Sequence, residues 1–193
     1  MNFFKRLFNI PEKEDKEIKN QEVKLSLDDL FVHKFVEKGG KFLYCIKNEE
    51  VKENFQKIID ENNWSSLFLL DEKLKSLFNL KLINIAKNIS GGIPIFTSCE
   101  HLIAENGDIM FSSNQLGSKK LNEYPDNFIV FATTSQIVKD TGQGLTGIKT
   151  NCKTLPTNIS SIRNYQINKN DDNFLNYGNS NSKNLYLLLL EDL

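Results

Sequence analysis

Apolar residues in the first half of the chain recur at helical spacing in some segments and form short continuous runs in others. The spacing predicts a helix that Ser26 caps and that Gly39-Gly40 ends, because glycine accepts the left-handed exit conformation. The elements expected next are a strand over 41–46, a helix with Val51, Phe55, Ile58 and Ile59 on one face, the apolar run 67–70, a short helix over 71–79 and the segment 82–89. Strands separated by helices predict a largely parallel sheet covered on both faces.

The strongest hairpin signal lies at Asn106-Gly107, between the apolar runs 102–104 and 109–111. Asn and Gly both tolerate the positive φ that a primed turn requires. We therefore expect an antiparallel hairpin with these two residues in its turn. Asp108 is expected to be a turn residue that accepts local backbone hydrogen bonds.

The rest of the second half predicts elements that join the hairpin in one mixed sheet. They are the run 93–99, a strand over 128–133, a helix that begins near Ser135, a strand near Thr154-Leu155, a short helix around 159–162 and a terminal strand over 185–190. Residues 168–183 are rich in Asn, Ser and Asp and predict a long surface loop. The predicted fold class is α/β: a single domain with a mixed, mostly parallel sheet flanked by helices.

Residues 1–24 are set apart as an N-terminal segment, and 25–193 as the α/β domain. At helical spacing, Phe4, Leu7 and Phe8 share one face beside basic residues, and a charged tether follows. This face is expected to cover the domain or another subunit, with weak peripheral membrane contact as the alternative. No apolar run approaches the roughly 20 residues that span a bilayer, so no transmembrane segment is expected.

Charge and cysteine content narrow the possible partners and cofactors. A net charge of −1, with acidic and basic residues interspersed, argues against nucleic acid, which requires a concentrated basic face. Cys45, Cys99 and Cys152 are odd in number and widely separated, so a reduced cytoplasm is the expected location. An iron–sulfur cluster needs about four thiolates, so no cofactor is expected in this chain and any clusters belong to partner subunits.

Hydroxyl-bearing residues lie just past two predicted strands and make the candidate site for a small anion. In open α/β sheets, ligands bind outside the carboxyl ends of the strands, where polar groups and N–H donors face them. Thr97-Ser98-Cys99-Glu100 and Thr133-Thr134-Ser135 hold these positions. Alternatively, Thr134 or Ser135 simply caps the helix that is expected to follow.

Glu100 and Glu105 are the carboxylates best placed for general acid–base or covalent catalysis, and the alternative is that they solvate a turn.

Cys99 and His101 are two residues apart in an extended segment and could share a metal ion. Two ligands do not make a metal site, so none is expected. The segment 142–147 matches Gly-x-Gly-x-x-Gly by letter. Because 135–141 is predicted to be helical, we interpret these glycines as a helix exit and loop rather than a dinucleotide site.

The order of motifs in the second half resembles the LUD domain, the family of the lactate-utilisation protein LutC. The matching features are Thr97-Ser98-Cys99-Glu100, the hairpin from Leu102 to Phe111, and the strand from Asn127 that leads to Gln136-Ile137-Val138. In that family an Ala-Glu-Thr-Gly-Thr hairpin precedes a Leu-Pro-x-x-His-Ile strand and a Gln-Ile-Val helix start. The chain departs from the family at Asn106 and Asp108, where threonines are usual, at Tyr124–Asn127, and at Asn176–Ser180, where Gly-Val-His-Gly-Pro is usual.

The resemblance implies a fold of the NagB/RpiA/CoA-transferase-like kind and a role in L-lactate oxidation. The chain would be a non-redox subunit or a small-anion-binding component, with iron–sulfur clusters in partner subunits. The candidate ligand-binding residues are Thr97, Ser98, Asn106, Gly107, Thr133, Thr134, Ser135 and Gly178. The alternative is an enzyme of the CoA-transferase or formyltetrahydrofolate cyclo-ligase kind that uses Glu100 or Glu105.

Overall fold

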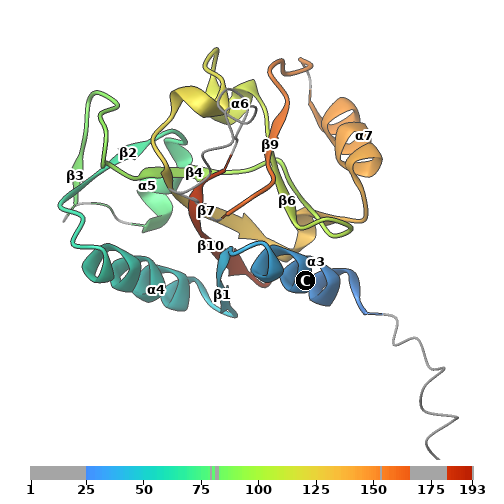
Figure 1. The fold of residues 1–193 in the computed structure, drawn as a ribbon, viewed down its shortest axis with the longest axis horizontal. Helices are drawn as coiled ribbons and strands as arrows, with labels where there is room; N and C mark the ends of the chain where they lie inside the picture. The colour runs from blue at the N-terminus through green and yellow to red at the C-terminus, as the bar shows by residue number, and fades with distance from the viewer. Residues whose placement is uncertain (1–24, 79, 81–82, 153, 166–181, 193) are drawn as a thin grey trace, which may run out of the picture.

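The chain folds around a central parallel sheet with helices on both of its faces (Figure 1). The computed structural model describes residues 25–78, 80, 83–152, 154–165 and 182–192. Its helices are α3 (Leu27–Glu37), α4 (Asn48–Glu61), α5 (Lys73–Phe78), α6 (Ser113–Leu116) and α7 (Thr141–Asn151), with the 3-10 helices η2 (Leu121–Glu123) and η3 (Thr134–Gln136). Its strands are β1 (Lys41–Cys45), β2 (Ser66–Leu69), β3 (Asn84–Ile85), β4 (Ile95–Ser98), β5 (His101–Ile103), β6 (Asp108–Phe111), β7 (Asn127–Thr133), β8 (Ile137–Val138), β9 (Ser160–Ile162) and β10 (Asn184–Leu190).

The main sheet has six strands in the order β1-β10-β7-β4-β2-β3, and every neighbouring pair is parallel. The last strand in sequence, β10, lies between β1 and β7, and its residues 185–189 are all buried. A continuous apolar run is what a parallel strand covered on both faces requires. The α/β fold class and the mostly parallel arrangement predicted from the sequence are confirmed.

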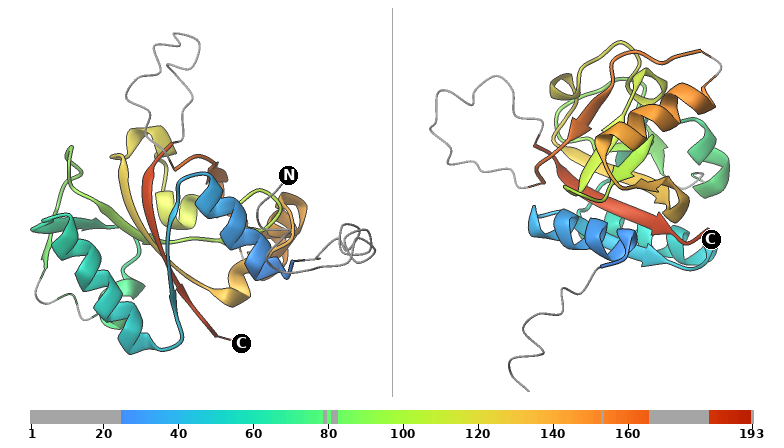
Figure 2. Two further views of the ribbon diagram at one scale, coloured as in Figure 1. Left: turned by 60° about the horizontal axis from the view of Figure 1, so that its bottom comes forward. Right: turned by 90° about the vertical axis from the view of Figure 1, so that its right-hand side faces the viewer.

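Alternating residues of the sheet face two separate cores. Leu187 of β10 packs in one core with Phe31 and Phe35 of α3, whereas Leu188 packs in the other with Phe55 of α4. This alternation follows from the period of two along a strand. In the left view of Figure 2, α3 and α4 accordingly lie on opposite sides of β1 and β10.

The predicted hairpin forms, but in a second sheet of order β8-β5-β6-β9 rather than in the main one. Both faces of the hairpin are buried. Leu102 and Ile109 face the core that α3 shares with the main sheet, whereas Ile103 and Met110 pack against Ile148 of α7. The hairpin is therefore a layer of its own between the main sheet and α7, which explains why it does not join the main sheet.

The turn of the hairpin contains Asn106 and Gly107, as expected, but it does not have the geometry of a primed turn. Ile103 pairs with Asp108, so four residues connect the strands, and Gly107 N–H donates to Ile103 O (2.8 Å). Gly107 has a φ of +71°, but Asn106 is not among the residues with positive φ. A Cβ on Gly107 would lie 2.6 Å from the backbone of Lys34 and Phe35, so the tip of the hairpin packs directly on α3.

Asp108 is not a turn residue, contrary to the prediction. It begins β6 and is 4% exposed, and its carboxylate lies 2.9 Å from Lys38 Nζ and 3.6 Å from Arg163 Nε. Beside it, the buried Tyr165 hydroxyl donates to Gly107 O (2.7 Å). Burial, and then the charge of Asp108, raise the pKa of Tyr165 well above its usual value, so it remains a neutral donor. Asp108 and Tyr165 thus hold the hairpin tip in place.

Four predictions between residues 135 and 162 are wrong. The segment after Thr133 forms η3 and then β8. The helix begins only at Thr141, where the N-cap residue Asp140 accepts a hydrogen bond from Gln143 N–H (2.9 Å). The glycines of 142–147 therefore lie inside α7 rather than after a helix. Residues 154–155 form no strand, and 160–162 form β9 rather than a helix because they pair with β6.

Two further predictions fall outside the described residues: the N-terminal segment 1–24, and Gly178 with most of the predicted 168–183 loop.

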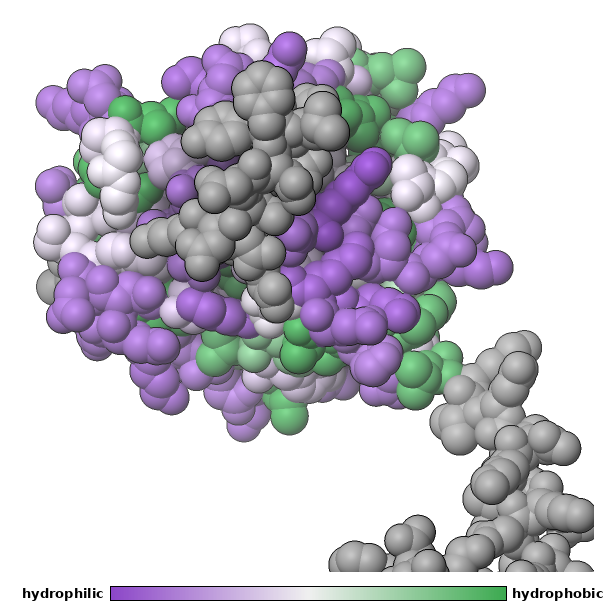
Figure 3. Space-filling view, in the orientation of Figure 1, coloured by the Kyte–Doolittle hydropathy of each residue, from purple (hydrophilic) through white to green (hydrophobic). Residues whose placement is uncertain are grey.

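Where the chain enters α3, Leu25 and Leu27 are 46% and 44% exposed, and Figure 3 shows apolar groups gathered there at the lower right. Among the described helices, none has the length and apolar character that crossing a bilayer requires.

Candidate functional site

Polar residues from three strands meet at the carboxyl edge of the main sheet. Leu190 pairs with Thr133 where β10 and β7 end, and Ser98 at the end of β4 pairs with Phe131 of β7. The residues that follow these strand ends are therefore neighbours. The structure therefore brings Thr97–Glu100 and Thr133–Ser135 to the same edge of the main sheet, and their role in binding a ligand stays a prediction.

The hydroxyl groups after β7 bind a carboxylate of the chain itself. Thr134 Oγ1 donates to Asp192 Oδ1 (2.9 Å), as does the backbone N–H of Ser135 (2.9 Å). Ser135 Oγ donates to Asp192 Oδ2 (2.7 Å) and lies 3.0 Å from Thr133 Oγ1. In return, Asp192 N–H donates to Thr134 Oγ1 (3.2 Å). We call these four residues the carboxylate cradle: Thr133, Thr134, Ser135 and Asp192.

The electrostatics of the carboxylate cradle favour a bound negative charge. Desolvation raises the pKa of Asp192, but the hydrogen bonds from Ser135, Thr134 and Thr133 outweigh it and lower the pKa to about 2. Asp192 is consequently ionised across the physiological range. Since it is also exposed, its carboxylate occupies a position that solvent can reach.

The last two residues of β4 make contacts of a different kind. Thr97 is fully buried and its hydroxyl donates to Ser98 O (3.0 Å), so it presents nothing at the surface. Ser98 Oγ donates to Asp71 Oδ2 (2.5 Å), which links the ends of β2 and β4. Of these two candidate ligand-binding residues, only Ser98 lies partly exposed at the sheet edge.

Gln136 joins the two loops of this edge, a role that the sequence analysis did not foresee. Its Nε2 donates to Cys99 O (2.7 Å) and Glu100 O (3.2 Å), while its Oε1 accepts from Thr133 N–H (2.8 Å). The side chain thereby fixes the spacing between the β4 and β7 ends. Asp192 was also missed, although the strand-end rule that selected Thr133–Ser135 applies equally to the residues after β10.

The surroundings of Cys99 and His101 do not favour metal binding. Burial, and then the charge of Glu100, raise the pKa of the Cys99 thiol far above its usual range, which disfavours the thiolate that a metal binds. His101 Nδ1 lies 3.3 Å from Gln136 O, and Gly147 of α7 closely covers its Nε2. Among the described residues, no group of three or more His, Cys, Asp and Glu side chains could hold a metal ion.

The two candidate catalytic glutamates lie apart, because Glu100 precedes β5 and Glu105 follows it. Glu100 Oε1 accepts hydrogen bonds from Ser112 Oγ (2.5 Å), Asn114 Nδ2 (2.8 Å) and Gln115 Nε2 (3.2 Å). These donors belong to the N-cap and first turn of α6, so the carboxylate anchors that helix.

Glu105 is exposed at the hairpin tip, and its backbone N–H donates to Lys139 O (2.9 Å). Asn106 and Gly107 lie at the same tip. Gly107 is buried against α3, and Asn106 Oδ1 accepts from Asp108 N–H (3.1 Å). The structure therefore does not bring these candidate ligand-binding residues to the carboxylate cradle, and their proposed role stays a prediction.

Comparison with known proteins gives a family and a fold. The family model described as LUD domain matches residues 94–190, half of the chain. No curated protein matches the chain. Among solved structures, the chain is similar to one titled as a DUF162 family protein from Deinococcus radiodurans, with a TM-score of 0.61 and 11% sequence identity over 87% of this chain and 99% of that one. At this identity the structural likeness concerns the fold. The family match includes Thr133, Thr134 and Ser135 of the carboxylate cradle and ends two residues before Asp192. The chain belongs to the LUD domain family.

Proposed function

We propose that this protein is a non-redox component of a lactate-utilisation system that oxidises L-lactate, and that it binds a small carboxylate in the carboxylate cradle. The observation that carries the proposal is the Asp192 carboxylate, which two hydroxyls and one backbone N–H of Thr134 and Ser135 bind at 2.7–2.9 Å. The same donors can bind the carboxylate of an external ligand when Asp192 moves away. Membership of the LUD family directs the choice of ligand to lactate.

The chemistry of the cradle suits a hydroxy acid in particular. A hydroxyl group both donates and accepts, so Thr133 and Ser135, whose hydroxyls lie 3.0 Å apart, can also bind the 2-hydroxyl of lactate. Hydrogen bonds to an ionised group are stronger than those between neutral groups, which favours the ionised acid. The proposed ligand is therefore a small 2-hydroxy carboxylate.

Electron transfer would be left to other subunits. Cys45 and Cys99 are buried and Cys152 is half-buried, and three thiols fall short of the four that an iron–sulfur cluster usually requires. We accordingly propose iron–sulfur subunits as partners. Catalysis by Glu100 is less well supported, because the three donors on its Oε1 give it a structural role in α6.

Growth on L-lactate tests the proposed function. Deletion of the gene should impair growth of the native organism on L-lactate but not on glucose, and the wild-type gene should restore it. Ser135→Ala should restore growth poorly, whereas Ser76→Ala, an equal change at an exposed position of α5, should restore it fully. Normal growth of the deletion strain on L-lactate would refute the role in lactate utilisation.

Affinity purification from the same cells tests the proposed partners. The tagged wild-type protein should recover iron-containing subunits, detected by an iron assay and mass spectrometry. Recovery of the protein without iron, from cells that grow on L-lactate, would contradict the proposed assembly.

A further inference from the structure

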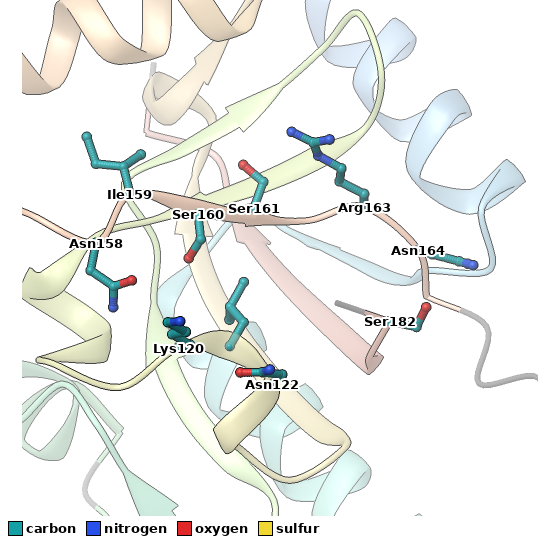
Figure 4. A pocket seen from close by; sticks show the side chains of 10 residues that line it. Lys120, Asn122, Asn158, Ile159, Ser160, Ser161, Arg163, Asn164 and Ser182 are labelled. Atoms are coloured by element: carbon teal, nitrogen blue, oxygen red, sulfur yellow. The ribbon is translucent and has the colours of Figure 1, made fainter. Parts of the chain in front are cut away.

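We propose that a cavity at the opposite edge of the main sheet binds a second small ligand, an oxyanion that also carries hydroxyl groups. The cavity has a volume of about 630 Å³ and lies between η2 and β9 (Figure 4). It faces the segments that lead into β7 and β10, whereas the carboxylate cradle follows the ends of these strands. The volume lies within the range of small-molecule sites. This proposal does not depend on the proposed function.

Lys120 supplies the charge that an oxyanion requires. Within the described residues, the hydrogen bonds of Lys120 involve its backbone: its N–H donates to Glu123 Oε2 (2.6 Å), and its O accepts from Glu123 N–H (3.0 Å). Its ammonium group pairs with no carboxylate of these residues. Arg163 also lines the cavity, but Figure 4 shows its side chain on the opposite side of β9, where Nε lies 3.6 Å from Asp108. Of the described cationic residues that line the cavity, Lys120 is therefore the one available to a ligand.

Ser160 gives an independent indication of a missing partner. Its Oγ is the one buried side-chain nitrogen or oxygen without a hydrogen bond among the described residues. In Figure 4, Ser160 points from β9 toward Lys120 and η2, whereas Ser161 points to the other side of the strand. A buried hydroxyl without a partner is costly and calls for an explanation. A ligand oxygen beside Lys120 would supply that partner after a small adjustment of the wall.

Amide groups complete the lining and favour a hydroxylated ligand. Asn158 adopts a φ of +52°, and its Nδ2 donates to Lys119 O (2.6 Å), so its position is fixed by the neighbouring loop. With Nδ2 engaged, its Oδ1 is the atom left to accept a hydrogen bond from a ligand hydroxyl. Asn122 of η2 lines the same cavity (Figure 4). A cation, a hydroxyl and two amides together suit a small hydroxylated oxyanion, whose charged group is either a phosphate or a carboxylate.

Calorimetric titration tests this proposal with three probes that share one carbon skeleton. Glycerol 3-phosphate and glycerate carry the two kinds of oxyanion, and glycerol is the neutral control, all at constant ionic strength. At least one of the two anions should bind, and Lys120→Gln should weaken its binding about tenfold, the effect of losing one charge-assisted hydrogen bond. Lys52→Gln, at an exposed position of α4, should bind like the wild type.

Ser160→Ala should weaken the same binding without lowering the melting temperature of the free protein, because the removed hydroxyl has no partner. Whichever anion binds identifies the charged group of the ligand. Binding of neither anion, equal binding of glycerol, or unchanged binding by Lys120→Gln would overturn the proposal. Binding that Ser135→Ala weakens but Lys120→Gln does not would place the ligand in the carboxylate cradle, and would refute only this second site.

Discussion

The hydrogen bonds around Asp192 make its contribution to stability depend on pH. Its folded pKa of about 2 lies below the ordinary value of 3.8 because hydrogen bonds from Ser135, Thr134 and Thr133 outweigh desolvation. The carboxylate therefore stabilises the fold above about pH 4, and this contribution is lost as the pH falls toward 2. Asp192→Asn should lower the melting temperature at pH 7, and the difference from wild type should shrink steadily below pH 4.

Thermal unfolding between pH 2 and pH 7 measures this difference. Glu53→Gln, on the exposed face of α4, is the matched control whose curve should run parallel to that of the wild type. A difference between Asp192→Asn and wild type that stays constant down to pH 2 would mean that the ionised carboxylate is not the stabilising group.

Gly107 is constrained both by its backbone conformation and by its close approach to α3. Its φ of +71° is one penalty for any other residue, and the approach of an added Cβ to within 2.6 Å of the α3 backbone is a second. Gly92 has a similar φ of +87° but open space around it, so it carries the first penalty alone. We expect Gly92→Ala to cost about 1 kcal/mol and Gly107→Ala about 3 kcal/mol or more in urea unfolding. Equal losses would show that the hairpin tip does not pack tightly on α3.

In α7, a glycine of the Gly-x-Gly-x-x-Gly segment 142–147 has a role in packing. Gly144 lies in the helix with a Cβ position 3.2 Å from Met110 Cε and 3.3 Å from Ile103 Cδ1, so its small size lets α7 approach the hairpin. Gly144→Val should destabilise the protein by about 1–3 kcal/mol through overpacking. Leu145→Val, at the exposed neighbouring position, should change stability by less than about 0.5 kcal/mol in the same urea titration. A neutral Gly144→Val would contradict this packing role.

The first half of the fold follows from local pattern, whereas parts of the second half do not. Apolar spacing and the Ser26 cap predicted α3, and the long apolar run predicted β10, because burial on one or both faces leaves a direct trace in the sequence. The short strands β8 and β9 leave no such trace. They are strands because Ile137 pairs with Leu102 and Ile162 with Ile109, contacts between residues distant in sequence.

The parallel topology of the main sheet explains which residues of the candidate site could be predicted from the sequence. The rule that ligands bind beyond the carboxyl ends of strands selected Ser98 and Thr133–Ser135, which do meet at one edge. Asp192 also follows a strand end, but its contact with Thr134 and Ser135 depends on β10 lying beside β7. The role of Gln136 depends on β4 lying on the other side of β7. Asn106 and Gly107 were chosen from their turn chemistry, which does not reveal that the turn packs on α3.

Direct calorimetric titration of L-lactate at pH 7 tests whether the carboxylate cradle binds L-lactate in competition with Asp192. Asp192→Ala should bind L-lactate more tightly than wild type, because the competing carboxylate is gone. Ser135→Ala should bind L-lactate about tenfold more weakly through loss of a charge-assisted hydrogen bond, and Ser76→Ala should be unchanged. No binding by Asp192→Ala, or an affinity that neither Asp192→Ala nor Ser135→Ala alters, would refute binding in the carboxylate cradle.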